Sequence, residues 1–365
     1  MMLSSSELTR TPLHVLRGGV LLCLLTAGAC SGPSGTAGGA AGGTASGSGT
    51  SAATGSTAAA GGHRGDDAMD KVNLVSYDKS VWLDLLRNNT RIRRTLTHTA
   101  TGLTAVTESD DPAIAAKIID HAKSMQARLT AGAPVRVWDP VFKEMFKNHG
   151  KVKLEVTPTE KGVSITESSD DPETLLLLRS HAMGVSEFVR SGTAVAGNQT
   201  ARFKAGDALP PAEVVFGGVS HRLLLAAPDA AQLEGLKRSG AVSVLNFRKP
   251  AEHPEYNEQA AVTSTGMTYC NMPYAGAEEL TDELLTAARG ALRAAGGKGE
   301  VLVVHCRSGN RLGPIWAAYR ALDMGVPVEQ AISEAKALRM RDAALEKAAR
   351  DYIRRQASTP AKGRT

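Results

Sequence analysis

The stretch EVLVVHCRSGNRLG, residues 300–313, determines how the C-terminal part of the chain folds. Its residues 301–304 form a short apolar run, which predicts a buried strand. The polar residues 306–311 include a glycine and predict a tight turn, and Pro314 lies where the first turn of a helix accepts proline. A strand, a glycine-bearing loop and a helix in this order bring backbone N–H groups together at a helix N-terminus, where they can bind an anion.

The residue types in this loop predict thiolate chemistry. Cys306 begins the loop, and the loop N–H groups, the helix dipole and two arginines, Arg307 and Arg311, all favour its nucleophilic thiolate form. Arg311 is placed to hold an anionic substrate or transition state with two parallel hydrogen bonds. The expected anion-binding loop comprises Arg307, Ser308, Gly309 and Asn310. The alternative is a buried structural cysteine beside a chance glycine turn.

The spacing of cysteine and arginine resembles two families. Protein tyrosine phosphatases carry His-Cys, five residues and then Arg, whereas here Leu312 occupies that arginine position and Arg311 precedes it. The shorter loop CRSGNR is similar to the active loop of rhodanese-type sulfurtransferases, which implies a cradle better suited to a persulfide than to a phosphate. The upstream sequence resembles instead the phosphatase-like domain family of beta-lactamase hydrolase-like proteins, which implies a dual-specificity-phosphatase-like fold with a rhodanese-like loop.

The resemblance also implies residues around the loop. The segment VLNFRKPAE, residues 244–252, is similar to the family's stretch after the same strand. It therefore implies that Arg248 and Glu252 lie near the site, with His305 directly before the cysteine. The plainer interpretation of Arg248 and Glu252 is a salt bridge at the surface.

The flanking sequence, residues 213–355, predicts an α/β domain. Apolar runs at 214–216, 223–225, 242–247 and 267–272 predict strands. Helical patterns at 228–239, after the capping residue Thr281, at 328–338 and at 343–354 alternate with them. Such alternation predicts a mostly parallel sheet flanked by helices, as in the protein tyrosine phosphatase fold, with active loops at the carboxyl ends of the strands.

The carboxylates near the loop bear on the choice of chemistry. A phosphatase needs an acid, commonly Asp, to protonate the leaving oxygen, yet residues 230–281 contain no Asp and offer only Glu252, Glu255 and Glu258 near the expected loop. Sulfur transfer needs no acid, so we predict an enzyme that works through a Cys306 persulfide. The alternatives are a phosphatase and a non-enzymatic anion-binding or interaction module. A small anionic substrate, a sulfane sulfur donor or a phosphate ester, is expected, with no cofactor.

Residues 71–190 contain an internal repeat. The sequence SDDP at 109–112 returns at 169–172, and His121-Ala122 returns at 181–182. Each unit predicts strand, glycine turn, strand and helix, because Asp at the N-cap followed by Pro starts a helix. The repeat predicts an α+β domain, a four-stranded antiparallel sheet covered by helices on one side, and residues 191–212 are expected to be a linker. The region is similar to uncharacterised secreted bacterial domains, which implies no function.

The histidines of the repeat invite a metal interpretation. His121 with Met125, and His98, His149 and His181, carry ligand types that suit copper in an exported protein. No paired HxH or HxxxH spacing occurs, however. We therefore expect half-buried, hydrogen-bonded histidines and no metal site.

Residues 1–30 predict an export signal. Arg10 and Arg17 precede the short apolar run 18–26, and the small residues 27–29 stand directly before Cys30. This resembles a bacterial lipobox and implies a lipid on Cys30 that anchors the protein to a membrane of the cell envelope; secretion without lipid is the alternative. Residues 31–70, almost wholly Gly, Ala, Ser and Thr up to residue 62, predict a disordered tether, and residues 356–365 a disordered tail.

Composition excludes some classes of function. The chain of 365 residues has a net charge of +5 and only 4% aromatic residues, and no basic run is interleaved with aromatics, so nucleic-acid binding is not predicted. Its four cysteines include Cys23 and Cys30 in the signal region. Cys270 and Cys306 alone are no disulfide scaffold, although an oxidising compartment could pair them.

Overall fold

The computed structural model describes residues 66–254 and 256–358, with side chains from residue 76 onward. The predicted export signal with Cys30, and residues 31–65 of the predicted tether, lie outside these residues. Within the described part of the chain, no helix is long and apolar enough to cross a membrane.

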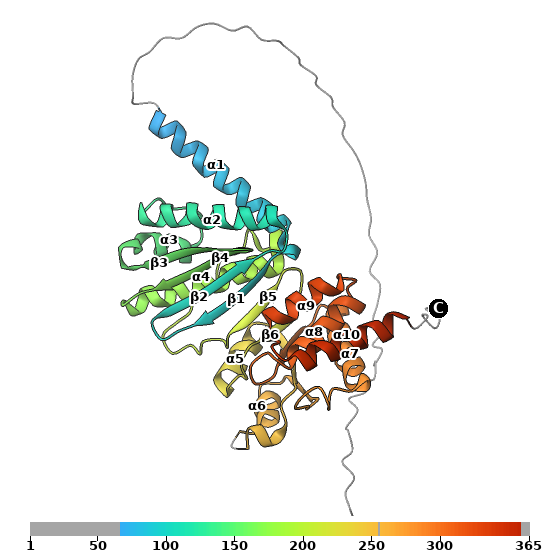
Figure 1. Cartoon of the computed structure of the whole chain (residues 1–365). Coiled ribbons are helices and arrows are strands. Elements are labelled where there is room, and N and C mark those ends of the chain that lie inside the picture. The colour runs from blue at the N-terminus through green and yellow to red at the C-terminus, as the bar shows by residue number, and fades with distance from the viewer. Residues whose placement is uncertain (1–65, 255, 359–365) are drawn as a thin grey trace, which may run out of the picture. The chain divides into compact units, whose positions relative to one another are not determined.

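The described chain is built of both helices and strands, which are interspersed along it (Figure 1). The N-terminal half, residues 66–191, contains α1 (Asp66–Arg87), β1 (Arg93–His98), β2 (Gly102–Glu108), α2 (Pro112–Thr130), α3 (Pro140–Lys147), β3 (Lys153–Thr159), β4 (Gly162–Ser168) and α4 (Pro172–Ser191). The C-terminal half, residues 213–358, contains β5 (Glu213–Phe216), β6 (Arg222–Leu224), α5 (Ala230–Arg238), β7 (Ala241–Asn246), α6 (Glu258–Ser264), β8 (Thr268–Asn271), α7 (Asp282–Gly297), β9 (Val301–His305), α8 (Leu312–Leu322), α9 (Val328–Ala337) and α10 (Ala343–Ser358).

Both units of the repeat have the order strand, glycine turn, strand and helix. Asp111 caps α2 by accepting hydrogen bonds from the backbone N–H groups of Ala113 and Ile114. Asp171 caps α4 in the equivalent place, by accepting from the N–H of Thr174. Proline follows each cap because the first helical position needs no N–H donor.

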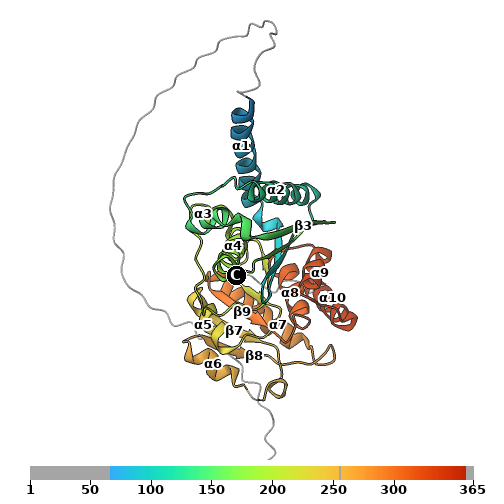
Figure 2. The ribbon, with the colours of Figure 1, turned by 90° about the vertical axis from the view of Figure 1, so that its left-hand side faces the viewer.

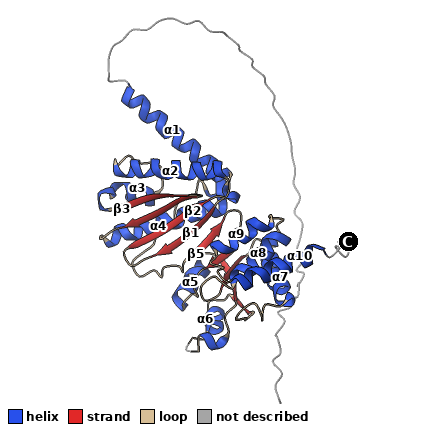
Figure 3. Ribbon diagram, viewed as in Figure 1, coloured by secondary structure: helices blue, strands red, loops and turns tan. Residues whose placement is uncertain are grey.

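The strands form one nine-stranded sheet, in the order β3-β4-β2-β1-β5-β6-β9-β7-β8 (Figure 3). The four repeat strands β3-β4-β2-β1 pair antiparallel as expected, but the sheet does not end at β1. Strand β1 would have an unpaired edge in a sheet that ended there, and β5 satisfies its backbone groups by antiparallel pairing, with Arg94 opposite Val215. The sheet is mixed, and its part β6-β9-β7-β8 is parallel as predicted.

The predicted linker, residues 191–212, is attached to the N-terminal half over its first part, and its end bonds to the C-terminal half, where the carbonyl of Leu209 accepts from Gln232. It begins with a short 3-10 helix, Gly192–Val195. Further along, buried Asp139 accepts hydrogen bonds from the backbone N–H and the hydroxyl of Thr200, at 3.0 and 2.8 Å. Ser180 accepts one from the N–H of Phe203. Separate folding of the two halves stays a prediction.

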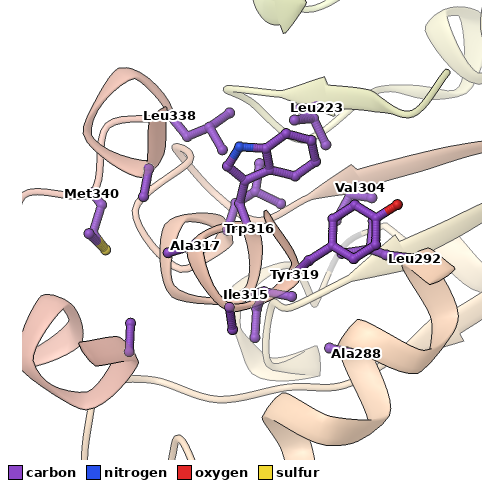
Figure 4. Packing of buried hydrophobic residues seen from close by; sticks show 14 of the residues in the cluster. Leu223, Ala288, Leu292, Val304, Ile315, Trp316, Ala317, Tyr319, Leu338 and Met340 are labelled. Carbon is purple, nitrogen blue, oxygen red and sulfur yellow. The ribbon is translucent and has the colours of Figure 1, made fainter. Parts of the chain in front are cut away.

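Helices cover both faces of the C-terminal part of the sheet (Figure 2). Leu245 and Val304 face one cluster, which α7, α8, α9 and α10 complete around buried Trp316 (Figure 4). Val244 and Val303 face the other, which α5 and α6 complete. Neighbouring residues of a strand point to opposite faces, so each apolar strand supplies both clusters.

Two predicted boundaries need correction. Helix α1 begins at Asp66, so residues 66–70 are helical rather than part of the tether. Helix α10 continues to Ser358, so residues 356–358 extend the helix into the predicted tail. Gln356 and Ala357 have high helix propensity, which allows the extension.

Candidate active site

The loop 306–311 joins the carboxyl end of β9 to the start of α8. Gly309 has a φ of 93°, and a Cβ at this position would clash with the carbonyl oxygen of Leu338, so the turn requires glycine. The backbone N–H of Gly309 donates to the sulfur of Cys306 at 3.1 Å. The loop thus folds back on the sulfur, as a strand–loop–helix unit built around an anion would.

The sulfur of Cys306 lies in a buried setting. The residue is 1% exposed, and no disulfide joins it to Cys270. Buried Tyr274 lies nearby, and its hydroxyl donates a hydrogen bond to the backbone carbonyl of Arg311. Burial, and then the electrostatic effect of Cys306, raise the pKa of Tyr274 well above its usual value. Tyr274 therefore keeps its proton and acts as a hydrogen-bond donor that holds the end of the loop.

The guanidinium of Arg311 is already occupied. It forms two hydrogen bonds of 2.6 Å with the carboxylate of Glu252, and Nη1 also donates to the carbonyls of Phe247 and Tyr274. Sequence reasoning expected Arg311 to face a substrate; in the structure it ties the loop to the ends of β7 and β8 instead. Its hydrogen bonds lower the pKa of Glu252, so Glu252 is ionised at neutral pH and is not a proton donor.

A buried polar network supports the loop from behind. Nε2 of His305 lies 2.6 Å from one oxygen of Glu258, and the other oxygen accepts hydrogen bonds from Arg248 at 2.9 Å and Asn246 at 2.7 Å. Burial would raise the pKa of Glu258, but His305 and Arg248 outweigh it and lower this pKa. The network fixes His305, and with it the direction in which Cys306 leaves the strand.

Sequence reasoning missed the roles of Asn246 and Glu258. It placed Glu258 among the nearby carboxylates and assigned it no partner. In the structure, Arg248 pairs with Glu258 rather than with Glu252. Asn246 is the last residue of β7, and a polar residue at the carboxyl end of a parallel strand was the available signal. Glu255, the other acid considered, lies outside the described residues.

The remaining loop side chains have different surroundings. Arg307 and Ser308 are exposed. The side-chain oxygen of Asn310 accepts from the backbone N–H groups of Arg341, at 2.8 Å, and Asp342, so it holds the segment before α10 rather than an anion. A cavity of about 350 Å³ adjoins the loop, lined by Arg248, Glu252, His253 and Arg307.

Comparisons with known proteins agree with the phosphatase-like interpretation of this region. Residues 224–323 match the sequence model of the family described as beta-lactamase hydrolase-like protein, phosphatase-like domain. This stretch runs from β6 to α8 and includes Cys306 and Arg311. The stretch that contains the Cys306 loop is thus similar to a phosphatase-like domain, which favours the phosphatase alternative over the predicted sulfur transfer.

Solved phosphatase structures resemble part of the chain. Tk-PTP in its active form is 16% identical and covers 37% of this chain and 92% of its own, with a TM-score of 0.33. TpbA of P. aeruginosa is 24% identical and covers 37% and 79%, with a TM-score of 0.30. Kinase associated phosphatase is 17% identical and covers 38% and 88%, with a TM-score of 0.35. No curated protein sequence matches the chain.

Proposed function

We propose that the C-terminal half hydrolyses phosphate monoesters, with Cys306 as the nucleophile. The observation that carries the proposal is the match to a phosphatase-like domain over the stretch that contains the loop. It is supported by the position of the sulfur at the carboxyl end of the central parallel strand β9, hydrogen-bonded to a loop N–H. Active loops of parallel sheets lie at this edge.

The proposed reaction has two displacements at phosphorus. The thiolate of Cys306 attacks phosphorus, and the bond from phosphorus to the ester oxygen breaks, so that the leaving group departs as an oxyanion that takes a proton from water and a phosphocysteine remains. Water then hydrolyses the phosphocysteine to free the thiolate and phosphate. Loop N–H groups and exposed Arg307 are placed to bind the phosphate oxygens. Since Glu252 is ionised, the leaving alcohol receives no proton from it, so aryl phosphates are expected to react faster than alkyl phosphates.

Sulfur transfer is the second candidate, and the state of Glu252 favours it. In this reaction the thiolate attacks the sulfane sulfur of thiosulfate, sulfite leaves with the bonding electrons, and a Cys306 persulfide remains. Sulfite is a stable anion and needs no proton donor. The site meets this requirement, because Arg311 holds the carboxylate of Glu252 ionised.

One pair of measurements separates the two reactions. The full chain is assayed for turnover of an aryl phosphate, and its intact mass is measured after incubation with thiosulfate. We expect turnover of the aryl phosphate that is lost in Cys306→Ser and kept in Cys270→Ser. We expect no gain in mass after incubation with thiosulfate. A gain of one sulfur atom at Cys306, reversed by cyanide and without phosphate release, would replace phosphatase by sulfurtransferase. Absence of both reactions would leave the non-enzymatic binding module.

We also propose that the protein is anchored to the cell envelope through a lipid on Cys30. The proposal depends on the small residues 27–29 before this cysteine. Cys30→Ser is expected to abolish labelling by a tagged fatty acid and to release the protein into the soluble fraction, while Cys23→Ser keeps both. Unchanged membrane association of Cys30→Ser would contradict the anchor.

A further inference from the structure

A large cavity lies in the N-terminal half, away from the Cys306 loop. Its volume is about 760 Å³, within the roughly 300–1,000 Å³ of small-molecule sites. Residues of α1, α2, α3 and α4 and of strands β1 to β4 line it, and most of the lining side chains are apolar. They include Trp82, Ile118, Met125, Phe142, Ile165 and Phe188.

The floor of the cavity is the inward face of the sheet. In register, Arg94 lies opposite Thr107, and Leu103 lies opposite Glu167. Ala105 stands between Thr107 and Leu103 on the same face of β2. It is fully buried and is the smallest side chain of this row.

Arg94 is a buried cation at this floor without a carboxylate partner. It is 4% exposed, its Nη1 donates to the hydroxyl of Thr107 at 2.8 Å, and its Nε has no partner. Among the described residues no carboxylate lies within ion-pair distance of Arg94, and burial lowers its pKa to about 10, although the charge of Glu167 opposes this shift. It remains charged at neutral pH. An unpaired buried charge is costly, so an anion at this position would relieve the cost.

Asp78 and Arg136, two other charged groups of the cavity wall, have partners. Asp78 accepts hydrogen bonds from Arg128 and Ser124. Arg136 pairs with Asp139 at 3.1 Å and donates to two backbone carbonyls of the segment after α4. Lys79 is exposed. Among the described residues that line the cavity, Arg94 is therefore the buried cation that is available to a ligand.

Two histidines add polar groups on the helix side. His121 of α2 and His181 of α4 occupy equivalent places in the two repeat units, and both line the cavity. Nδ1 of each ring has no hydrogen-bond partner, and the nearest carboxylate oxygen, of Glu167, is 3.6 Å from that of His181. Burial lowers the pKa of His121, so its ring is neutral at pH 7. Both histidines are half-buried as expected, but the expected hydrogen bond is missing at Nδ1 of each ring.

We propose that this cavity binds a monoanionic amphiphile, a single alkyl or acyl chain that ends in a carboxylate placed on Arg94. The apolar walls suit the chain, and the unpaired guanidinium suits a carboxylate, which it can bind with two parallel hydrogen bonds. The floor carries one cation, Arg94, and the carboxylate of Glu167 lies on the same floor. This distribution of charge disfavours a doubly charged head group. Val137 and Trp138, which are 55% and 49% exposed, lie at the edge of the cavity and mark its entrance.

The test compares ligands that differ only in the head group. Dodecanoate, dodecanol and dodecyl phosphate are titrated below their aggregation concentrations into the full chain, by calorimetry and by tryptophan fluorescence, since Trp82 and Trp138 line the cavity. Dodecanoate is expected to bind at least about tenfold more tightly than dodecanol, the effect of one charged hydrogen-bonded pair. Arg94→Met is expected to remove this preference and to keep the affinity for dodecanol.

Control variants separate the head-group site from the chain site. Ala105→Leu fills the floor and is expected to weaken both ligands, whereas Arg202→Met, at a half-exposed position outside the cavity, changes neither. Equal affinity of the wild-type chain for dodecanoate and dodecanol would overturn the proposal. This comparison uses the wild-type chain alone and does not depend on the folding of a variant. Tighter binding of dodecyl phosphate, or an unchanged preference in Arg94→Met, would overturn the assignment of a carboxylate to Arg94.

Discussion

Two buried arginines, one in each half of the chain, differ in what surrounds their guanidinium groups. Arg311 is 8% exposed and contacts a carboxylate and two backbone carbonyls. Arg94 is 4% exposed and has one hydroxyl as its partner. A fully paired guanidinium stabilises the structure around it, whereas an unpaired one retains its capacity to bind. The residue that the sequence singled out as an anion ligand is thus the paired one.

The same difference extends to the packing around each arginine. Behind the Cys306 loop, Glu258 pairs with both His305 and Arg248, and Trp316 fills the adjacent core. Under Arg94 the helices and the sheet enclose a cavity of about 760 Å³. The C-terminal half therefore holds a loop rigidly, and the N-terminal half leaves room for a ligand.

The largest expected effect tests the paired side. Glu258→Gln removes the charge that faces both His305 and Arg248, and we expect it to lower the free energy of unfolding by about 3–5 kcal/mol, the cost of breaking a buried ion pair. Glu167→Gln, in the cavity, is the matched control and should cost about 1 kcal/mol or less, because its nearest partner is 3.6 Å away. Urea unfolding measures both. Equal costs would remove the contrast between the halves.

The next effect tests packing directly. Ala317 and Ala105 are both 0% exposed, but Ala317 lies in the dense cluster around Trp316 (Figure 4), and Ala105 faces the cavity. Ala317→Leu should overpack the core and destabilise by about 1–3 kcal/mol, while Ala105→Leu should be neutral or stabilising because it fills empty space. Thermal and urea unfolding are the measurements. Greater damage from Ala105→Leu would show that the cavity is not an open space.

A smaller effect compares the two repeat units. Asp111→Ala and Asp171→Ala remove equivalent helix caps, and each should cost about 1 kcal/mol of unfolding free energy. Asp170→Ala is the neighbouring control; its side chain is 82% exposed and pairs with Lys153 alone among the described groups, so it should cost about 0.5 kcal/mol or less. A cost at Asp170 as large as at the caps would contradict the assignment.

The smallest effect is a pH dependence of the Arg311 pair. Because the folded pKa of Glu252 is lowered, chiefly by its hydrogen bonds to Arg311, the pair stabilises the protein fully above the unfolded value of about 4.5. This contribution is lost as pH falls through the lowered folded pKa. The difference in urea midpoint between wild type and Glu252→Gln should therefore be constant from pH 7 to pH 5 and shrink below pH 4.5. A difference that is the same at pH 3 and pH 7 would exclude the pair as its source.

Local features of the chain could be predicted because they depend on neighbours within a few residues. The caps Asp111, Asp171 and Thr281 bond to N–H groups of their own first helical turn. The strand, loop and helix around Cys306 follow one another directly, and the turn depends on Gly309. Such patterns leave their full signal in the sequence, so most elements of the C-terminal half were predicted close to their observed bounds; the short helix α6, Glu258–Ser264, was missed.

The sequence by itself determined these elements, the repeat and the cysteine loop. The tertiary structure alone decided that β5 joins both halves into one sheet, that Glu252, far from Arg311 along the chain, occupies its guanidinium, and that Arg94 is buried beside a cavity with one hydroxyl as its hydrogen-bond partner. The physical reason is range. Capping and turn energies arise between adjacent residues, whereas pairing of a strand edge, neutralisation of a charge and the filling of a volume depend on segments brought together only when the whole sheet forms.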